Sequence, residues 1–274
     1  MITFPNAKIN LGLNIISKRP DGYHNLETVF YPVPIKDALE IIVRGNQHED
    51  TLVEAGTKVD ATPDCNLVMR ALKLMREKYF FPKVEVHLLK KIPFGAGLGG
   101  GSADASFMLR LLNDTFELKI ADEELISLAA HLGADCPFFI HNRPIFASGI
   151  GEIFEDIKVS LNGYYLVLIK PDIHVSTKDA FSEIKPQLPE LSLKEVVKRP
   201  VSDWKDLMIN DFEKSVFAKY PKIREIKDSL YDKGAIYASM SGSGSSVFGI
   251  FNKDMKDIQA DYLDCYVWTG KLIY

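Results

Sequence analysis

The most unusual stretch of the chain is the glycine-rich segment PFGAGLGGGSADAS, which runs from Pro93 to Ser106. Five glycines fall within the seven positions from Gly95 to Gly101, and the residues that follow have the apolar spacing of a helix. Backbone without side chains can approach an anion closely, and the first N–H groups of a helix are unpaired and carry partial positive charge. A flexible turn is the usual interpretation of an isolated glycine pair. This density of glycine before a helix instead favours a phosphate-binding loop.

The better-known glycine-loop templates do not fit this segment. Gly95, Gly97 and Gly100 satisfy the pattern G-x-G-x-x-G. However, the preceding VEVHLLKKIPF alternates charged and apolar residues, unlike the buried parallel strand of a dinucleotide-binding fold. A Walker A loop would end in Gly-Lys-Ser/Thr, and a protein kinase would carry VAIK, HRD and DFG elements. The sequence supplies neither set, so the phosphate-binding loop must belong to another class.

Composition and charge limit the class of protein further. With 274 residues and 46% apolar content, the chain can bury a core and form one large or two ordinary domains. Its net charge of −4 comes with Lys and Arg spread along the sequence, so no basic stripe indicates nucleic-acid or anionic-membrane binding. The start MITFPNAKIN has no basic region followed by an apolar run, and the three cysteines are far apart. We therefore expect a cytoplasmic globular protein without nucleic-acid or membrane partners.

The elements around the glycine segment are expected to mix α and β structure. Residues 7–15 alternate apolar and polar side chains, as in a half-buried strand, so Lys8 and Asn10 should share the face away from the core. The same reasoning predicts strands at 37–43 and 84–88, and helices at 66–78, from 103 onward, and at 122–132 before Gly133.

A second unit is expected to begin near the apolar strand 164–170, after a loosely patterned stretch. Helices around 202–219 and 221–233, strands on either side of SGSGSS, a short helix from Asp254 and a last strand near Tyr266 indicate helices packed on an antiparallel sheet. The sequence therefore predicts an α+β protein with two domains, residues 1–155 and residues 156–274.

Three segments together resemble the motifs of the GHMP family of small-molecule kinases. They are PNAKINLGL, PFGAGLGGGSADAS and SGSGSSVFGIF, and they occur in the family's order and at suitable spacing. The resemblance extends from Ala7 to Phe251. It implies the two-domain GHMP kinase fold, with an N-terminal domain similar to ribosomal protein S5 domain 2 and a ferredoxin-like C-terminal domain. It also implies ATP as co-substrate, together with Mg²⁺.

A further segment, DGYHNLETVF, narrows the resemblance within this family. Together with GLGGGSADA and LGADCPFF, it is similar to the branch that phosphorylates the 2-hydroxyl of 4-(cytidine 5'-diphospho)-2-C-methyl-D-erythritol in the non-mevalonate (MEP) isoprenoid pathway. Asp21, Gly22, Tyr23 and His24 carry this narrower assignment. The alternatives are another small-molecule kinase of the family, acting on a mevalonate-like alcohol or homoserine, and a non-catalytic nucleotide-binding module.

Lys8 and Asp135 are the candidate catalytic residues, and their joint presence argues against the non-catalytic alternative. Phosphoryl transfer needs an anion cradle, a metal that shields the phosphates, a nearby positive charge and a base. The resemblance assigns Asp135 as the base that takes the proton of the acceptor hydroxyl. It places Lys8 nearby, where its charge would keep the carboxylate ionised and stabilise the transition state. Without the resemblance, an Asp in LGADCPFF is more typical of a turn.

The resemblance divides the remaining site residues between the two substrates. Tyr23 and Phe181 would stack on the two faces of the cytosine ring, and His24 would bind its polar edge. A β-branched residue at Gly99 or Gly101 should weaken ATP binding, because it resists positive φ and blocks the phosphates. The full set implied for ATP is Pro93, Gly95, Gly97, Leu98, Gly99, Gly100, Gly101, Ser102, Asn66, Leu67 and Lys90, and for the acceptor substrate Asn10, Tyr23, His24, Thr177, Phe181 and Gly242.

No protein ligand for Mg²⁺ is expected. Many family members carry serines where this chain has Gly100 and Gly101, and the second of those serines commonly helps to hold the metal. Mg²⁺ should therefore be needed mainly through the nucleotide phosphates. Cys136 is expected to be a packing residue, because no histidine near it in sequence could activate it. The histidines are spaced too irregularly for a metal centre.

Overall fold

The computed structural model describes residues 1–45, 48–57 and 65–273. Within these residues the chain forms two compact units, each built from segments that are separate in the sequence. The first unit contains Met1–Ala7, Ile35–Phe94 and Gly99–Asn142, and the second contains Lys8–Pro34, Gly95–Leu98 and Arg143–Tyr274. The domain division expected at residue 155 stays a prediction.

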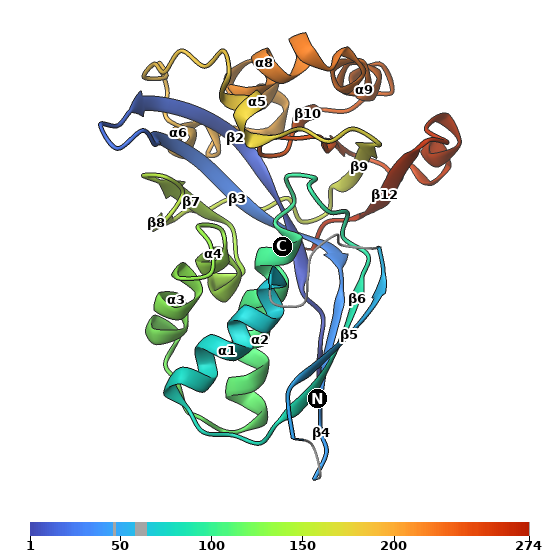
Figure 1. Ribbon diagram of the computed structural model, residues 1–274. Coiled ribbons are helices and arrows are strands. Elements are labelled where there is room, and N and C mark those ends of the chain that lie inside the picture. The colour runs from blue at the N-terminus through green and yellow to red at the C-terminus, as the bar shows by residue number, and fades with distance from the viewer. Residues whose placement is uncertain (46–47, 58–64, 274) are drawn as a thin grey trace. The chain divides into compact units, whose positions relative to one another are not determined.

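The first unit packs helices on one face of a sheet with the strand order β1-β4-β6-β5 (Figure 1). Strand β5 is parallel to β6, and the other neighbours are antiparallel. Alternate residues of the central strands, such as Leu39 and Val86, share a core with the helices. The strands are β1 (Ile2–Thr3), β4 (Ala38–Val43), β5 (Thr51–Gly56) and β6 (Val84–Lys90), and the helices are α1 (Leu67–Lys78), α2 (Gly100–Thr115), α3 (Asp122–Ala130) and α4 (Cys136–His141).

The helices of this unit form where the sequence predicts them, with small shifts at their ends. Helix α1 confirms the expected helix, and Asn66 is its N-cap, because the Asn66 side chain accepts a hydrogen bond from the Val68 N–H at 2.9 Å. Helix α2 begins at Gly100, earlier than the apolar spacing indicates, and α3 ends at Ala130, before Gly133. The glycines therefore extend into the first turn of α2.

The second unit contains two sheets. Their strand orders are β2-β3-β7-β8 and β10-β11-β9-β12, and all neighbours in the second sheet are antiparallel. The strands are β2 (Asn6–Lys18), β3 (His24–Lys36), β7 (Ile145–Ser148), β8 (Ile153–Asp156), β9 (Tyr165–Pro171), β10 (Tyr237–Met240), β11 (Val247–Phe251) and β12 (Cys265–Lys271). The helices are α5 (Thr177–Phe181), α6 (Leu193–Val196), α7 (Trp204–Leu207), α8 (Phe212–Lys219) and α9 (Pro221–Asp232), with 3-10 turns η2 (Val201–Asp203) and η3 (Lys256–Asp261).

The expected pattern of helices on an antiparallel sheet is confirmed in this unit, since α8 and α9 share a core with β9, β10 and β11. Residues 202–219, however, form η2, α7 and α8 rather than one helix. The break occurs because Leu13 of β2 pairs with the chain between α7 and α8. The Leu13 N–H donates to the Ile209 carbonyl, and the Asp211 N–H donates to the Leu13 carbonyl, both at 2.8 Å.

Among the helices that the structure describes, none has both the length and the apolar composition needed to cross a bilayer.

Candidate functional site

The glycine-rich segment leads from the end of β6 into α2. Gly95, Gly97 and Gly99 have φ values of +61°, +74° and +69°, which side chains rarely tolerate. Gly99 is the N-cap of α2 and makes no side-chain cap, so the first turn of this helix presents backbone N–H groups and its positive dipole end. This arrangement can bind a phosphate. The expectation of positive φ is confirmed at Gly99 and is wrong at Gly101, which lies inside α2 with ordinary helical φ.

In the second unit, residues 95–98 pack directly on the third glycine motif. The Ser241 hydroxyl donates to the Gly97 carbonyl at 2.9 Å, and the Ser246 N–H donates to the Ala96 carbonyl at 3.3 Å. A Cβ atom at Gly97 would lie 2.0 Å from the Ser241 carbonyl oxygen. Only glycine fits there, because the backbones of the two motifs touch.

Lys8 and Asn10 share one face of β2, as predicted, but the expectation of a half-buried strand is wrong. Both side chains are buried, with 4% and 2% exposure. The Lys8 Nζ donates to the Asn10 Oδ1 at 2.7 Å, the Asn10 Nδ2 donates to the Thr28 Oγ1 at 2.9 Å, and the Thr28 hydroxyl donates to the Gly12 carbonyl at 2.6 Å. This chain of hydrogen bonds orients the amide of Asn10 so that its oxygen faces the Lys8 ammonium.

The backbone of Asn10 extends this network to the third glycine motif. The Asn10 N–H donates to the Ser241 hydroxyl at 3.3 Å, and a Cβ atom at Gly242 would lie 3.4 Å from the Asn10 Oδ1. The Lys8 N–H also donates to the Leu98 carbonyl at 3.0 Å. The structure therefore brings together Lys8, Asn10, Leu98 and Gly242, which the sequence predicted as site residues, in the second unit.

Two residues that sequence reasoning missed hold this arrangement. Thr28 is one: it lies on β3 and accepts a hydrogen bond from the Asn10 side chain, a contact that the local sequence does not indicate. Asn210 is the other. Its Nδ2 donates to the carbonyls of Met240 and Gly242, both at 2.8 Å, and so fixes the start of the third motif. Nothing in the local sequence singles out Asn210.

The residues expected at the cytosine lie on β3, on α5 and in the turn before β3. His24 begins β3 and stacks on Phe181 of α5, with ring centroids 4.8 Å apart. Tyr23 is 62% exposed and follows a tight turn, in which its N–H donates to the Asp21 carboxylate at 3.1 Å. That hydrogen bond lowers the pKa of Asp21. Thr177 is the first residue of α5. The structure therefore brings His24 and Phe181 together and leaves Tyr23 exposed.

In the first unit, the N-terminus of α1 lies against the first turn of α2. A Cβ atom at Gly101 would be 3.5 Å from the Leu67 Cδ1, an ordinary contact. The Asn66 Nδ2 donates to the Glu54 carboxylate at 2.7 Å, which connects the N-cap of α1 to strand β5. Asn66 and Leu67 therefore flank the glycines that open α2.

Asp135, the candidate base, is a partly buried residue immediately before α4. The following residue, Cys136, is buried in the core, and the Ser106 hydroxyl of α2 donates to its carbonyl at 2.7 Å. Burial raises the pKa of the Cys136 thiol to about 11, so it is protonated at neutral pH and packs as expected. Asp135 and Lys8 belong to different units.

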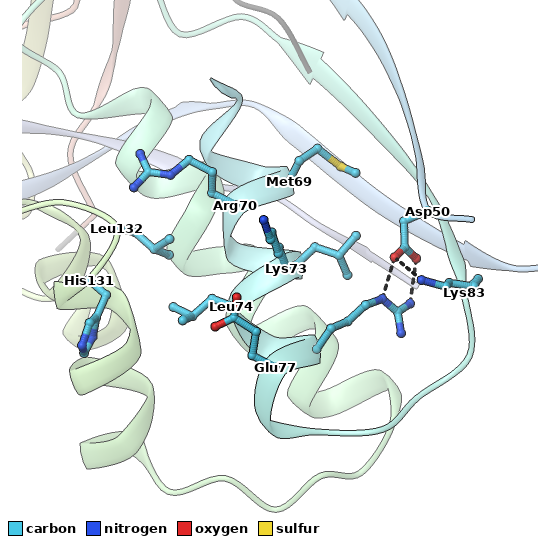
Figure 2. Close-up of a pocket in the computed structure, with 11 residues that line it drawn as sticks. Asp50, Met69, Arg70, Lys73, Leu74, Glu77, Lys83, His131 and Leu132 are labelled. Atoms are coloured by element: carbon cyan, nitrogen blue, oxygen red, sulfur yellow. Dashed lines mark hydrogen bonds and ion pairs between the residues drawn. The ribbon is translucent and has the colours of Figure 1, made fainter. Parts of the chain in front are cut away.

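A hollow of about 830 Å³ runs along α1, and none of the expected site residues lines it. Figure 2 shows Asp50 and Lys83 at one end of the hollow, on the right, and Arg70 and His131 on the left. At that end, the Arg76 guanidinium forms an ion pair with Asp50 at 2.5 Å and also donates to the Phe81 carbonyl. Because these charges pair with one another and with backbone, this end of the hollow is a structural junction between α1 and the chain before β6.

Models of the GHMP kinase family match the chain in two places. The model of the GHMP kinases N terminal domain matches residues 66–143, and the model of the GHMP kinases C terminal matches residues 192–266. A crystal structure of 4-(cytidine 5'-diphospho)-2C-methyl-D-erythritol kinase is similar over 100% of both chains, with a TM-score of 0.83 and 30% identity. The fold is that of a GHMP kinase, and the expected α+β class is confirmed.

Curated relatives extend the similarity over the whole chain. The 4-diphosphocytidyl-2-C-methyl-D-erythritol kinase of Bacteroides fragilis is 61% identical over 273 residues, which cover 99% of this chain and 100% of that protein. The kinase of the same name from Parabacteroides distasonis is 56% identical with the same coverage. The chain belongs to the 4-diphosphocytidyl-2-C-methyl-D-erythritol kinase family within the GHMP kinases, which use ATP.

Proposed function

We propose that the chain transfers the terminal phosphoryl group of ATP to the 2-hydroxyl of 4-(cytidine 5'-diphospho)-2-C-methyl-D-erythritol. The product is the 2-phosphate, an intermediate of the MEP isoprenoid pathway. The observation that carries this proposal is the 61% identity with the Bacteroides fragilis kinase along the full length of both proteins. The exposed Tyr23 and the neighbouring His24–Phe181 stack support it, because they offer aromatic faces to a pyrimidine.

In this reaction, Asp135 accepts the proton of the 2-hydroxyl while that oxygen forms a bond to the terminal phosphorus of ATP. The bond from that phosphorus to the bridging oxygen breaks, and ADP leaves. Lys8 supplies positive charge for the transferring phosphoryl group, and the Asn10–Thr28 chain orients its ammonium. The first turn of α2, with its bare glycine backbone, binds the phosphates of ATP.

Mg²⁺ is proposed as the metal that accompanies ATP, where it neutralises phosphate charge. Among the described residues, no group of three or more His, Cys, Asp and Glu side chains is arranged to hold a metal ion. Gly100 and Gly101 offer no hydroxyl group. We propose that Mg²⁺ binds mainly through the nucleotide phosphates.

The proposed function is tested by measuring ADP release with a panel of acceptors: the cytidyl substrate, mevalonate, homoserine and galactose. Release that depends on the cytidyl substrate is the expected result. Release with one of the other alcohols would assign the chain to a different acceptor within the family. ATP binding without ADP release from any acceptor would identify a non-catalytic nucleotide-binding module.

Replacing Tyr23 with alanine should raise KM for the cytidyl substrate roughly 5- to 150-fold, because a base–aromatic stack contributes about 1–3 kcal/mol. KM for ATP should change far less. Since Tyr23 is 62% exposed, its removal should not unfold the protein. Steady-state kinetics with each substrate varied in turn provide the measurement.

A suitable control for this variant is Phe80→Ala, because Phe80 is an aromatic residue with 99% exposure and is not among the site residues. Phe181→Ala should raise KM for the cytidyl substrate in the same direction but less strongly. Equal increases in both KM values of Tyr23→Ala would indicate a folding defect. An unchanged KM for the cytidyl substrate would place the cytosine elsewhere.

A further inference from the structure

One buried ion network connects the two ends of the glycine-rich segment. Asp37 lies immediately before β4, Lys90 is the last residue of β6, and Asp104 lies in α2, one turn beyond Gly100. The three residues are 1%, 5% and 2% exposed, all within the first unit. A buried charge is costly unless it is paired, so this network has to be neutralised internally.

The hydrogen bonds of the network hold the backbone just before the glycine-rich segment and helix α2, which the segment begins. The Lys90 Nζ donates to the Asp37 Oδ2 and to the Asp104 Oδ2. The other oxygen of Asp37, Oδ1, accepts hydrogen bonds from the Lys91 N–H and, at 2.8 Å, from the Ile92 N–H. Asp37 therefore fixes residues 91 and 92, just before the segment, and Asp104 connects the first turns of α2 to the same network.

The same ammonium also lies beneath the first residue of α2. A Cβ atom at Gly100 would be 3.4 Å from the Lys90 Nζ and 2.9 Å from the Ile92 Cγ2. The first turn of α2 thus packs on the network with little space. With both carboxylates within hydrogen-bond distance and 5% exposure, Lys90 directs its charge into the protein.

The network contains one ammonium and two carboxyl groups, so it is neutral only when one carboxyl group holds a proton. Burial raises the pKa of Asp104 to about 8; the Lys90 charge opposes this increase and the Asp37 charge adds to it. The Asp104 Oδ1 is buried and has no hydrogen-bond partner among the described residues. A pKa in this range favours the protonated form of Asp104 at pH 7.

We propose that Asp37, Lys90 and Asp104 are positioning residues, which hold the glycine-rich segment and the first turn of α2 in the geometry that binds ATP, and that the Lys90 ammonium does not contact the nucleotide. This inference rests on the proposed function and revises the contact between Lys90 and ATP that the family resemblance implies. The groups that face Asp104 across the network are Lys90 and Asp37.

The first test is the pH dependence of the Kd for ATP, measured by titration calorimetry without acceptor. As the pH rises from 7 to 9, Asp104 should lose its proton and leave a net negative charge behind the phosphate-binding turn. The Kd of the wild-type protein should then increase about fivefold or more. Asp104→Asn, which is isosteric and cannot ionise, should lack this increase. An equal increase in the variant would overturn the inference, because titration of ATP itself affects both proteins alike.

The second test separates positioning from direct contact. Lys90→Met should weaken ATP binding more than tenfold, because it leaves the Asp37 carboxylate buried without a cation. Adding Asp37→Asn removes that charge, and the asparagine Oδ1 can still accept from the Lys91 and Ile92 N–H groups. The double variant should therefore recover most of the lost affinity. If Lys90 instead bound ATP, a folded double variant would bind as weakly as the single variant, and the inference would be wrong.

These measurements separate the inference from the proposed function. A wild-type protein that bound no ATP would overturn both. ATP binding with the wrong variant pattern would overturn the inference alone, since nucleotide affinity is measured without the acceptor. Circular dichroism melting curves identify any variant that fails to fold. If Lys90→Met does not fold, the pH dependence of Asp104→Asn still decides the inference.

Discussion

Replacing Asp135 with asparagine should lower turnover roughly a hundredfold or more and leave the Kd for ATP nearly unchanged. Loss of a positioned base typically costs this much, because the acceptor hydroxyl must then lose its proton to water. Asparagine has the size of aspartate, and Asp135 lies before α4 rather than in its core, so the fold should persist. The measurement is a single-turnover rate at saturating ATP and cytidyl substrate, where the chemical step limits the rate.

A matched control for this experiment is Asp114→Asn. It removes the same charge from an exposed position on α2 in the same unit and should keep normal turnover. Lys8→Met should resemble Asp135→Asn in lowering kcat, because it removes the charge proposed to stabilise the transition state. Near-native single turnover by Asp135→Asn would require withdrawal of the base assignment. A parallel loss of ATP binding would indicate a role in the nucleotide site instead.

Much of the secondary structure follows from local sequence, because local periodicity and capping determine it. The helix at 66–78 could be predicted from its apolar spacing. Asn66 caps it, because an asparagine side-chain oxygen can accept a hydrogen bond from the first N–H groups of a helix. The strand at the start of the chain could also be predicted. Its burial could not, because Asn10, on the same face as Lys8, is hydrogen-bonded to Thr28 and Ser241, which the local sequence does not indicate as neighbours.

Local sequence does not reveal contacts between residues far apart in the chain, and this explains which parts of the candidate site were missed. Glycine density indicated the segment that is proposed to bind phosphate, and its positive φ values at Gly95, Gly97 and Gly99 are of the kind that glycine allows. Nothing local indicated that Asn210 would hold the third motif or that Asp37 would bond to the entry of the second. Both act through contacts between residues far apart in the chain. The discontinuous units have the same origin, since residues 8–34 join a unit formed mainly by residues 143–274.

The second large effect is expected at Gly97, where alanine should weaken ATP binding at least about tenfold. The φ of +74° costs an L-residue about 1–2 kcal/mol, and the new Cβ would lie 2.0 Å from the Ser241 carbonyl oxygen. The position of a Cβ atom is fixed by its own backbone, and the Ser241 oxygen is itself a backbone atom. No side-chain rotation can therefore relieve the clash, and overpacking adds about 1–3 kcal/mol. Residues 95–98 would have to move away from Ser241, which would break the hydrogen bond from its hydroxyl to the Gly97 carbonyl.

Gly234→Ala is the control that separates this clash from backbone strain alone. Gly234 has a φ of +92° with no heavy atom within 4 Å of an added Cβ, so its variant should lose stability and keep its ATP affinity. Calorimetric Kd values for ATP and melting temperatures of both variants give the comparison. A folded Gly97→Ala protein with wild-type ATP affinity would show that residues 95–98 do not shape the phosphate site. The geometry predicts the opposite, because the contact between the second and third glycine motifs leaves no space for a side chain at position 97.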